Sequence, residues 1–223
     1  MRPLPPDFFA RPTLEVAPDL LGRLLVHDDP VGGRLAGRIV ETEAYTEDDP
    51  AMHGWRALFG LDGRVLPQGR AADLFAPPGT AYVYKIYGTY WLLNVVTEPA
   101  GVAGCVLVRA VDPVEGEDVM AARRPAARRR ADLTNGPGKL TLALGIADPA
   151  FHGRDLTRPP LFFADPPGGH TPPPTETSSR IGLTRGVERQ ARFYIPHDPF
   201  VSPGEPSDRR VARRTGRLRR TTP

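Results

Sequence analysis

A carboxylate stands within an apolar segment of the sequence. Residues 34–45 alternate as a β-strand does, and Glu43 lies near the end of this segment with Glu41 on the same face. A buried carboxylate is costly unless it has partners. Arg109 is a similar exception, because it is the single charge in "CVLVRAV". We expect Glu43 and Arg109 to meet, either as a structural ion pair or as a carboxylate that is held ready to activate water.

Aromatic side chains gather on one short ribbon. Residues 81–94, "AYVYKIYGTYWLLN", hold four of the six tyrosines and one of the two tryptophans. Tyr87 precedes Gly88 at the expected turn of a hairpin, so its ring either folds back on the sheet or projects as a wedge that enters between base steps of a duplex. Tyr45, His53 and Tyr84 could form walls around one flat ring, since stacking on aromatic side chains contributes roughly 1–3 kcal/mol per base.

Two other kinds of site are less well supported by these residues. Glu41 and Glu43 share one strand face, whereas the carboxylates of a glycosidase that acts on sugars flank the scissile bond. A metal site built from Glu43, Asp48, Asp49 and His53 lacks a recognisable ligand spacing, so we expect no metal.

Composition limits the class of protein. The chain has 223 residues, 40% of them hydrophobic, which is enough for one sizeable domain. Cys105 is the only cysteine, so an internal disulfide is excluded and a reducing cytosol is expected. The first residues lack the apolar run of a signal peptide, and no segment approaches the roughly 20 apolar residues of a membrane span.

Charge is concentrated at the C-terminal end. The net charge is +3, but residues 207–223 carry seven arginines and one aspartate. We therefore expect a single domain over residues 1–206 and a disordered arginine-rich tail over residues 207–223. The tail is either a solvated end or a source of salt-dependent affinity for DNA.

The remaining segments predict a mixed α+β domain with a mainly antiparallel sheet surrounded by helices. The expected elements are a helix over 13–25 with Thr13 as N-cap, a strand over 34–45, a long loop over 46–80, a hairpin over 81–97, a strand over 104–111, a helix ended by Pro125, a helix after "LTNGPGKL", a loop over 158–179, and strands at "RIGLTRG" and "ARFYI". Lys139 lies at the start of one helix, where free amides either hold a phosphate or form a plain cap.

Several sequence blocks occur in an order that is specific to one family. The blocks are "GRIVETEAYTEDDPAMHG", "AYVYKIYGTYWLLNVV", "CVLVRAVDP", "LTNGPGKLTLALGI" and "RIGLTRG…RFYI". Over about residues 8–204 the chain closely resembles the alkyladenine (3-methyladenine) DNA glycosylases of base-excision repair. The resemblance implies a curved, open-barrel-like sheet and an enzyme that flips alkylated or deaminated purines, such as 3-methyladenine and hypoxanthine, out of double-stranded DNA. Such an enzyme hydrolyses the bond between base and sugar and leaves an abasic site.

The resemblance also implies a role for each site residue. Glu43 resembles the general base that activates water, and Arg109 resembles the residue that helps to hold this water and Glu43. The pocket that sandwiches the flipped base corresponds to Tyr45, His53 and Tyr84. Asn94 resembles the gate against the exocyclic amino group of guanine, and Tyr87 resembles the minor-groove wedge.

Further expectations follow from the resemblance and from lysine placement. We expect no cofactor, a monomer, and a cytoplasmic, nucleoid-associated bacterial protein. No lysine is placed to form a Schiff base, so we expect no strand-cleaving lyase step. A non-catalytic DNA-binding protein remains the main alternative, although it would not need Glu43 beside Arg109.

The chain departs from the family pattern at four places. Met52 precedes the pocket histidine, residues 54–69 are extra, Ala71 replaces a common asparagine, and Thr89 replaces methionine in the wedge turn. These departures leave the expected chemistry intact. We expect them to affect which lesions the protein removes and how tightly it binds DNA.

Overall fold

A single curved antiparallel sheet organises the protein. The structure is a computed structural model, and it describes residues 1–53 and 69–220. Within them, nine strands form one sheet in the order β3-β4-β5-β2-β1-β7-β6, with β9 paired to β2 and β8 to β9. The strands are β1 (Leu24–Asp29), β2 (Gly33–Thr46), β3 (Ala81–Ile86), β4 (Tyr90–Val96), β5 (Gly104–Glu115), β6 (Thr157–Arg158), β7 (Leu161–Ala164), β8 (Glu176–Ser178) and β9 (Arg192–Tyr194). This arrangement confirms the predicted fold class.

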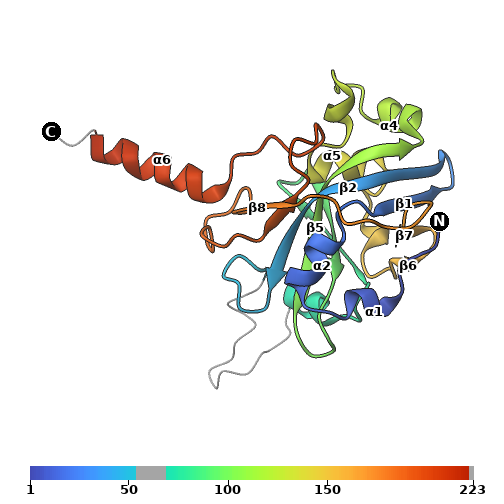
Figure 1. Ribbon diagram of the computed structural model, residues 1–223, viewed down its shortest axis with the longest axis horizontal. Coiled ribbons are helices and arrows are strands. Elements are labelled where there is room, and N and C mark those ends of the chain that lie inside the picture. Colours follow the sequence, from blue (N-terminus) through green and yellow to red (C-terminus); the bar gives the residue numbers. More distant parts are fainter. Residues whose placement is uncertain (54–68, 221–223) are drawn as a thin grey trace.

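Short helices lie around the sheet, and a longer C-terminal helix, α6, projects away from it (Figure 1). They are α1 (Pro6–Phe9), α2 (Thr13–Asp19), α4 (Glu117–Arg123), α5 (Pro137–Ala143) and α6 (Ser207–Arg220), with 3₁₀ turns η1 (Gly69–Phe75), η2 (Arg130–Leu133) and η3 (Pro149–Phe151). The main core contains residues of α2, α5 and the sheet, among them Val16, Leu93, Val108 and Leu140. Among the described helices, none is long and apolar enough to cross a membrane.

Strand β2 is the centre of the sheet, because its first half pairs with β1 and its second half pairs with β9, while β5 runs along its length. Close approach of β2 and β5 requires a glycine: a Cβ placed on Gly37 would lie 2.5 Å from a methyl group of Val111. The pairing of β2 with β5 is irregular near Glu41, which is opposite Ala110, whereas Thr42 is opposite Val108. Arg109 therefore has no direct partner on β2, as in a β-bulge that redirects a side chain.

A second, smaller cluster of buried side chains lies under the aromatic hairpin. It contains Met52, Leu74, Tyr82 and Cys105 together with smaller residues, and Tyr45 and Tyr84 pack against it. Residues of β2, β3, β5 and η1 thus meet in one place, which becomes the wall of the cavity described below.

Most predicted elements are present, and the differences concern both termini and two loops. The helix predicted over 13–25 ends at Asp19, because Gly22 adopts φ +80 and the chain continues into β1. Thr13 is the first residue of α2 and not its N-cap, and its hydroxyl contacts Thr97 and Glu98. The segment "RIGLTRG" is not a strand, since only Ile181 forms an isolated bridge, with Pro206.

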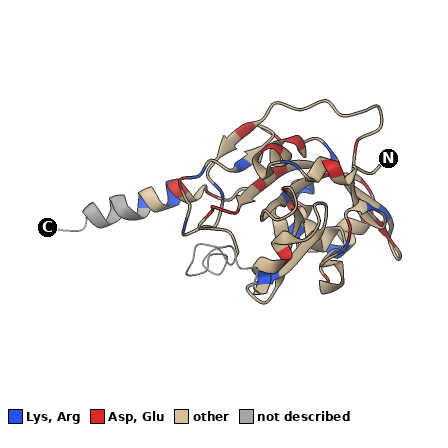
Figure 2. Cartoon of the chain, turned by 90° about the horizontal axis from the view of Figure 1, so that it is seen from below, with Lys and Arg blue, Asp and Glu red and all other residues tan. Residues whose placement is uncertain are grey.

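The loop predicted over 158–179 and the C-terminal segment contain regular structure that the sequence did not predict. Strands β6, β7 and β8 lie in or beside the loop predicted over 158–179. Residues 207–220, expected to be disordered, form α6, which projects from the body of the protein in Figure 1 and in the view turned by 90° in Figure 2. The extra residues 54–69 lie outside the described residues, except for Gly69 at the start of η1.

Candidate active site

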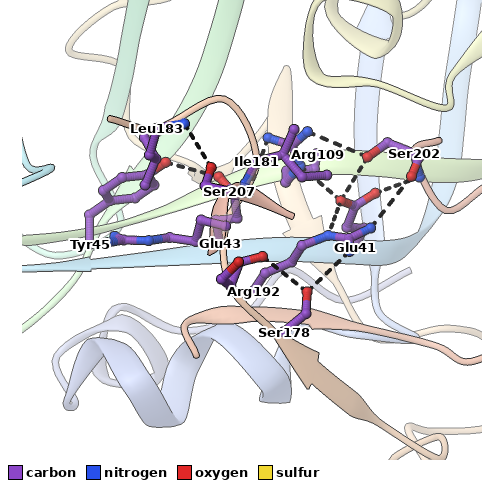
Figure 3. Close-up of polar contacts among 12 residues, drawn as sticks. Glu41, Glu43, Tyr45, Arg109, Ser178, Ile181, Leu183, Arg192, Ser202 and Ser207 are labelled. Carbon is purple, nitrogen blue, oxygen red and sulfur yellow. Dashed lines mark hydrogen bonds and ion pairs between the residues drawn. The ribbon is translucent and has the colours of Figure 1, made fainter. Parts of the chain in front are cut away.

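Two carboxylates and one arginine meet where the pairing of β2 with β5 is irregular (Figure 3). Glu41 and Glu43 are fully buried, and Arg109 is nearly so. Arg109 donates from Nε to Oε1 of Glu41 at 2.8 Å, and its Nη1 lies 3.2 Å from Oε1 of Glu43. The expected meeting of Glu43 and Arg109 is present, and the irregular pairing at Arg109 directs its side chain between the two carboxylates.

The carboxylate of Glu41 is fully occupied by protein partners. Arg192 donates from Nε to Oε1 at 2.7 Å, and Ser202 donates from its backbone N–H and its hydroxyl at 2.6 and 2.8 Å. With Arg109 these make four hydrogen bonds, about as many as a carboxylate accepts. Burial favours the protonated form, but Arg109 and Arg192 outweigh it, so the pKa of Glu41 is lowered and Glu41 stays charged.

The carboxylate of Glu43 has fewer partners. Its Oε1 accepts the backbone N–H of Ile181 at 2.7 Å, and its Oε2 accepts the hydroxyl of Tyr45 at 2.9 Å (Figure 3). Together with Arg109 these make three contacts, which leaves acceptor capacity for a water molecule. Burial disfavours the charge of Arg109, but Glu43 and Glu41 outweigh it and raise the pKa of Arg109 above its usual value. Arg109 therefore remains a fixed cation beside Glu43.

A cavity of about 90 Å³ lies next to this carboxylate. All four predicted base-binding residues line it, and the complete lining is Tyr45, Ala51, His53, Leu74, Tyr82, Tyr84, Asn94, Cys105 and Leu183. The rings of His53 and Tyr84 are 4.3 Å apart between centroids. Glu43 is not part of the lining, and it lies behind Tyr45, to whose hydroxyl it is bonded. The cavity is therefore an aromatic site with a buried carboxylate at its back.

Tyr82 fixes the imidazole of His53. The Tyr82 hydroxyl lies 2.8 Å from Nδ1 of His53. Burial, and then the charge of Arg70, lower the pKa of His53, so its ring is neutral. Burial raises the pKa of Tyr82, whose hydroxyl keeps its proton. This hydrogen bond occupies Nδ1 and orients the ring, and it leaves Nε2 for another partner. Sequence reasoning did not assign a role to Tyr82, although it lies on the same face as Tyr84.

Asn94 is held by two groups beside the cavity. Its side-chain amide donates to the carbonyl of Tyr82 at 3.0 Å, and the Cys105 thiol lies 3.8 Å from its Oδ1. Burial raises the pKa of Cys105 to about 12, so the thiol is protonated and can donate this weak bond. The orientation of the Asn94 amide is thus set by the protein.

Tyr45 is packed against a buried arginine that the sequence did not point to. The guanidinium of Arg180 lies 4.4 Å from the centroid of the Tyr45 ring, donates to the carbonyl of Ala44 at 2.8 Å, and forms an ion pair with Asp49. Arg180 belongs to an irregular loop, and neither its spacing nor its neighbours in the sequence indicate this position.

Tyr87 projects from the tip of the β3–β4 hairpin. Its side chain is 87% exposed, and Tyr87 and Gly88 have φ of 49° and 68°, as in the tight turns of such hairpins. Beside it lies a groove formed mainly by the hairpin and the start of α5, which includes Tyr90 and Lys139. Lys139 donates from Nζ to Oδ1 of Asn135 at 2.6 Å, and it lines this groove beside Tyr87 and not the aromatic cavity.

Among residues 1–53 and 69–220, no group of three or more His, Cys, Asp or Glu side chains is placed to hold a metal ion.

Comparison with known proteins identifies relatives of this chain. The model of the family described as "Methylpurine-DNA glycosylase (MPG)" matches residues 7–199. A protein of Salinibacter ruber with the name "Putative 3-methyladenine DNA glycosylase" is 59% identical over 210 residues, which are 93% of this chain and 100% of the relative. Proteins of the same name from Chlorobium luteolum and Methanocella arvoryzae are 44% and 42% identical and cover 90% and 92% of this chain and 97% and 98% of their own.

Proposed function

The chain belongs to the methylpurine-DNA glycosylase family, and on this premise we propose that it removes 3-methyladenine from double-stranded DNA by hydrolysing the N-glycosidic bond. One observation carries the proposal: Glu43 keeps acceptor capacity beside a cavity walled by Tyr45, His53 and Tyr84. A DNA-binding protein without catalysis would need the rings but not this carboxylate.

The damaged nucleotide must leave the stack before the base can reach the cavity. Flipping costs a few kcal/mol, and less for a damaged base. The exposed ring of Tyr87 offsets part of this cost by entering the space that the nucleotide leaves. Lys139, beside the same hairpin tip, is placed to contact a phosphate of the DNA.

Glu43 is the general base. It takes a proton from a water molecule while the water oxygen bonds to the anomeric carbon of the sugar, and the bond from that carbon to the purine nitrogen breaks. The electrons of this bond go to the purine, which leaves as a neutral base because methylation had made it cationic. Arg109 holds Glu43 and its charge in place, and the product is an abasic site.

Selectivity comes from the walls of the cavity. Tyr45, His53 and Tyr84 stack on or contact the flipped base, and Nε2 of His53, which is not bonded to Tyr82, is the ring nitrogen left to form a hydrogen bond with it. The fixed amide of Asn94 meets the position of the exocyclic amino group of guanine and excludes undamaged guanine. Stacking accepts any purine, so we include hypoxanthine among the substrates. Hypoxanthine is neutral, so it must also gain a proton from a general acid or from water in order to leave as a neutral base.

The abasic product is left uncut, because no lysine is placed to form a Schiff base. Lys85 lies over the ring of Trp91, and Lys139 bonds to Asn135. The residues of the proposed site all come from one chain, and we propose that a monomer is active.

The test is release of free base from DNA. DNA treated with a methylating agent is incubated with the protein, and the released bases are separated by chromatography. A duplex with one hypoxanthine is incubated in parallel and then treated with alkali, which cuts at abasic sites. We expect 3-methyladenine in the first assay, cleavage in the second only after alkali, and no covalent complex with borohydride. Binding to DNA without release of any base would favour the non-catalytic alternative.

A further inference from the structure

The start of α6 is bonded to a loop that reaches the candidate site. This loop, residues 179–183, is the first part of the segment between β8 and β9, and α6 lies beyond residues 7–199, to which the family model is matched. Residues from Ser207 to Arg210 contact this loop, and Figure 3 shows one of these contacts, between Ser207 and Leu183.

Ser207 is the centre of these contacts. It is fully buried, its backbone N–H donates to the carbonyl of Arg180 at 2.9 Å, and its hydroxyl accepts the backbone N–H of Leu183 at 2.9 Å. Arg210 donates from Nη2 to the carbonyl of the same Leu183 at 2.7 Å. Both backbone groups of Leu183 are therefore held by α6.

Hydrogen bonds between Ser179 and Asp208 also attach the loop to α6. The hydroxyl of Ser179 donates to Oδ1 of Asp208 at 2.6 Å, and the backbone N–H of Asp208 lies 3.2 Å from that hydroxyl. The start of α6 thus holds the loop at three of its five residues.

The same loop also forms part of the candidate site. Arg180 packs on the ring of Tyr45, Ile181 donates its N–H to Glu43 at 2.7 Å, and Leu183 lines the cavity. Apart from the single bridge at Ile181, the loop has no pairing within a regular element, and Gly182 adopts φ +80. Contacts from outside the loop must therefore fix the positions of Ile181 and Leu183.

We propose that the first turn of α6 is a brace that sets the position of the general base and of one cavity wall, with Ser207 and Arg210 as positioning residues. The inference rests on the proposed glycosylase function. Ser207 and Arg210 act through Leu183 and the adjoining Ile181, and neither needs to touch the substrate. Small displacements of reacting groups are expensive, since about 1 Å can cost roughly 100-fold in rate.

The test compares two arginines of the same helix. Arg210→Met removes the donor to Leu183, whereas Arg209→Met removes the same charge from an exposed neighbour that makes no side-chain hydrogen bond to the loop. Ser207→Ala removes the acceptor for the Leu183 N–H and is measured beside them. The rate of release of 3-methyladenine is measured in single turnover with saturating enzyme, so that it does not depend on the folded fraction. Affinity for DNA that contains an abasic analogue is measured separately.

We expect Arg210→Met and Ser207→Ala to lower the single-turnover rate by roughly 10- to 100-fold. Arg209→Met should keep the wild-type rate, and affinity should change equally in the two arginine variants because they lose the same charge. Equal rates for Arg209→Met and Arg210→Met overturn the brace, and so does a loss in Arg210→Met that appears only as weaker binding. A wild-type protein without base release overturns the proposed function itself.

Discussion

Glu41 and Glu43 lie two residues apart on one strand, but removal of the Glu41 charge and removal of the Glu43 charge should have different consequences. In Glu43→Gln, Arg109 and Arg192 both keep Glu41 as their carboxylate partner. In Glu41→Gln, Arg109 keeps Glu43, but Arg192 loses the only carboxylate with which it forms an ion pair among the described residues. We therefore predict a catalytic defect for Glu43→Gln and a folding defect for Glu41→Gln.

The magnitudes follow from burial and partner number. Loss of one partner of a buried ion pair costs about 3–5 kcal/mol, which lowers the melting temperature of a protein of this size by roughly 6–20 °C. Glu41→Gln should show this loss. Loss of a general base lowers the rate by roughly 10²- to 10⁴-fold. Glu43→Gln should show this loss, with a melting temperature within a few degrees of wild type.

Two measurements on the same preparations distinguish a catalytic defect from a folding defect. Thermal unfolding gives the melting temperature, and single-turnover release of 3-methyladenine at 25 °C gives the rate of folded enzyme. The reasoning is refuted if Glu43→Gln keeps wild-type activity while it loses stability, because Glu43 would then be the structural member of the cluster. A Glu41→Gln protein as stable as wild type would show that Arg192 needs no charged partner.

Three further outcomes are expected. Tyr87→Ala should weaken binding to DNA with an abasic analogue by about 1–3 kcal/mol, and unchanged affinity would mean that the ring does not enter the duplex. Truncation after Ala212 keeps the brace, and it should make the salt dependence of DNA binding shallower by about 0.9 in logarithmic slope for each arginine that meets a phosphate; an unchanged slope identifies the tail as a solvated end. Burial opposes ionisation of Asp29, but the N–H groups of Gly32 and Val31 and the cation of Arg123 lower its pKa from 3.8 to about 2. Because the pKa is lower in the folded protein, this stabilisation of about 2 kcal/mol is present above about pH 4 and is lost as the pH falls towards 2. The difference in unfolding free energy between wild type and Asp29→Asn should shrink over that range, and a constant difference would contradict it.

The elements that the sequence predicted are those with local signals. The hairpin over 81–97 was predicted from alternation and a turn at Gly88, and β3 and β4 confirm it. The contact of Glu43 with Arg109 was predicted because each is a charge in an apolar strand, and such charges need partners. In both cases the signal lies within a few residues of the feature.

The missed features depend on contacts between distant segments. The helix predicted over 13–25 from the spacing of Leu20, Leu21 and Leu24 included the first two residues of β1, and the rest of β1 was not predicted. The pairing that makes this segment a strand comes from β2 and β7. Ile181 donates to Glu43 across 138 residues, and it does so through its backbone, which every residue except proline offers. Residue type therefore carries no signal for this contact.

The partner counts of the two carboxylates explain how one strand face can hold both a structural and a reactive group. Glu41 accepts hydrogen bonds from Arg109, Arg192 and Ser202, so the cost of burying both arginines is offset at Glu41. Glu41 therefore fixes the position of Arg109. Nη1 of Arg109 orients the carboxylate of Glu43 and leaves it with acceptor capacity for water. A single carboxylate shared by both arginines would be saturated and could not accept a proton from water. The proposed chemistry at Glu43 thus depends on Glu41, which takes no part in it.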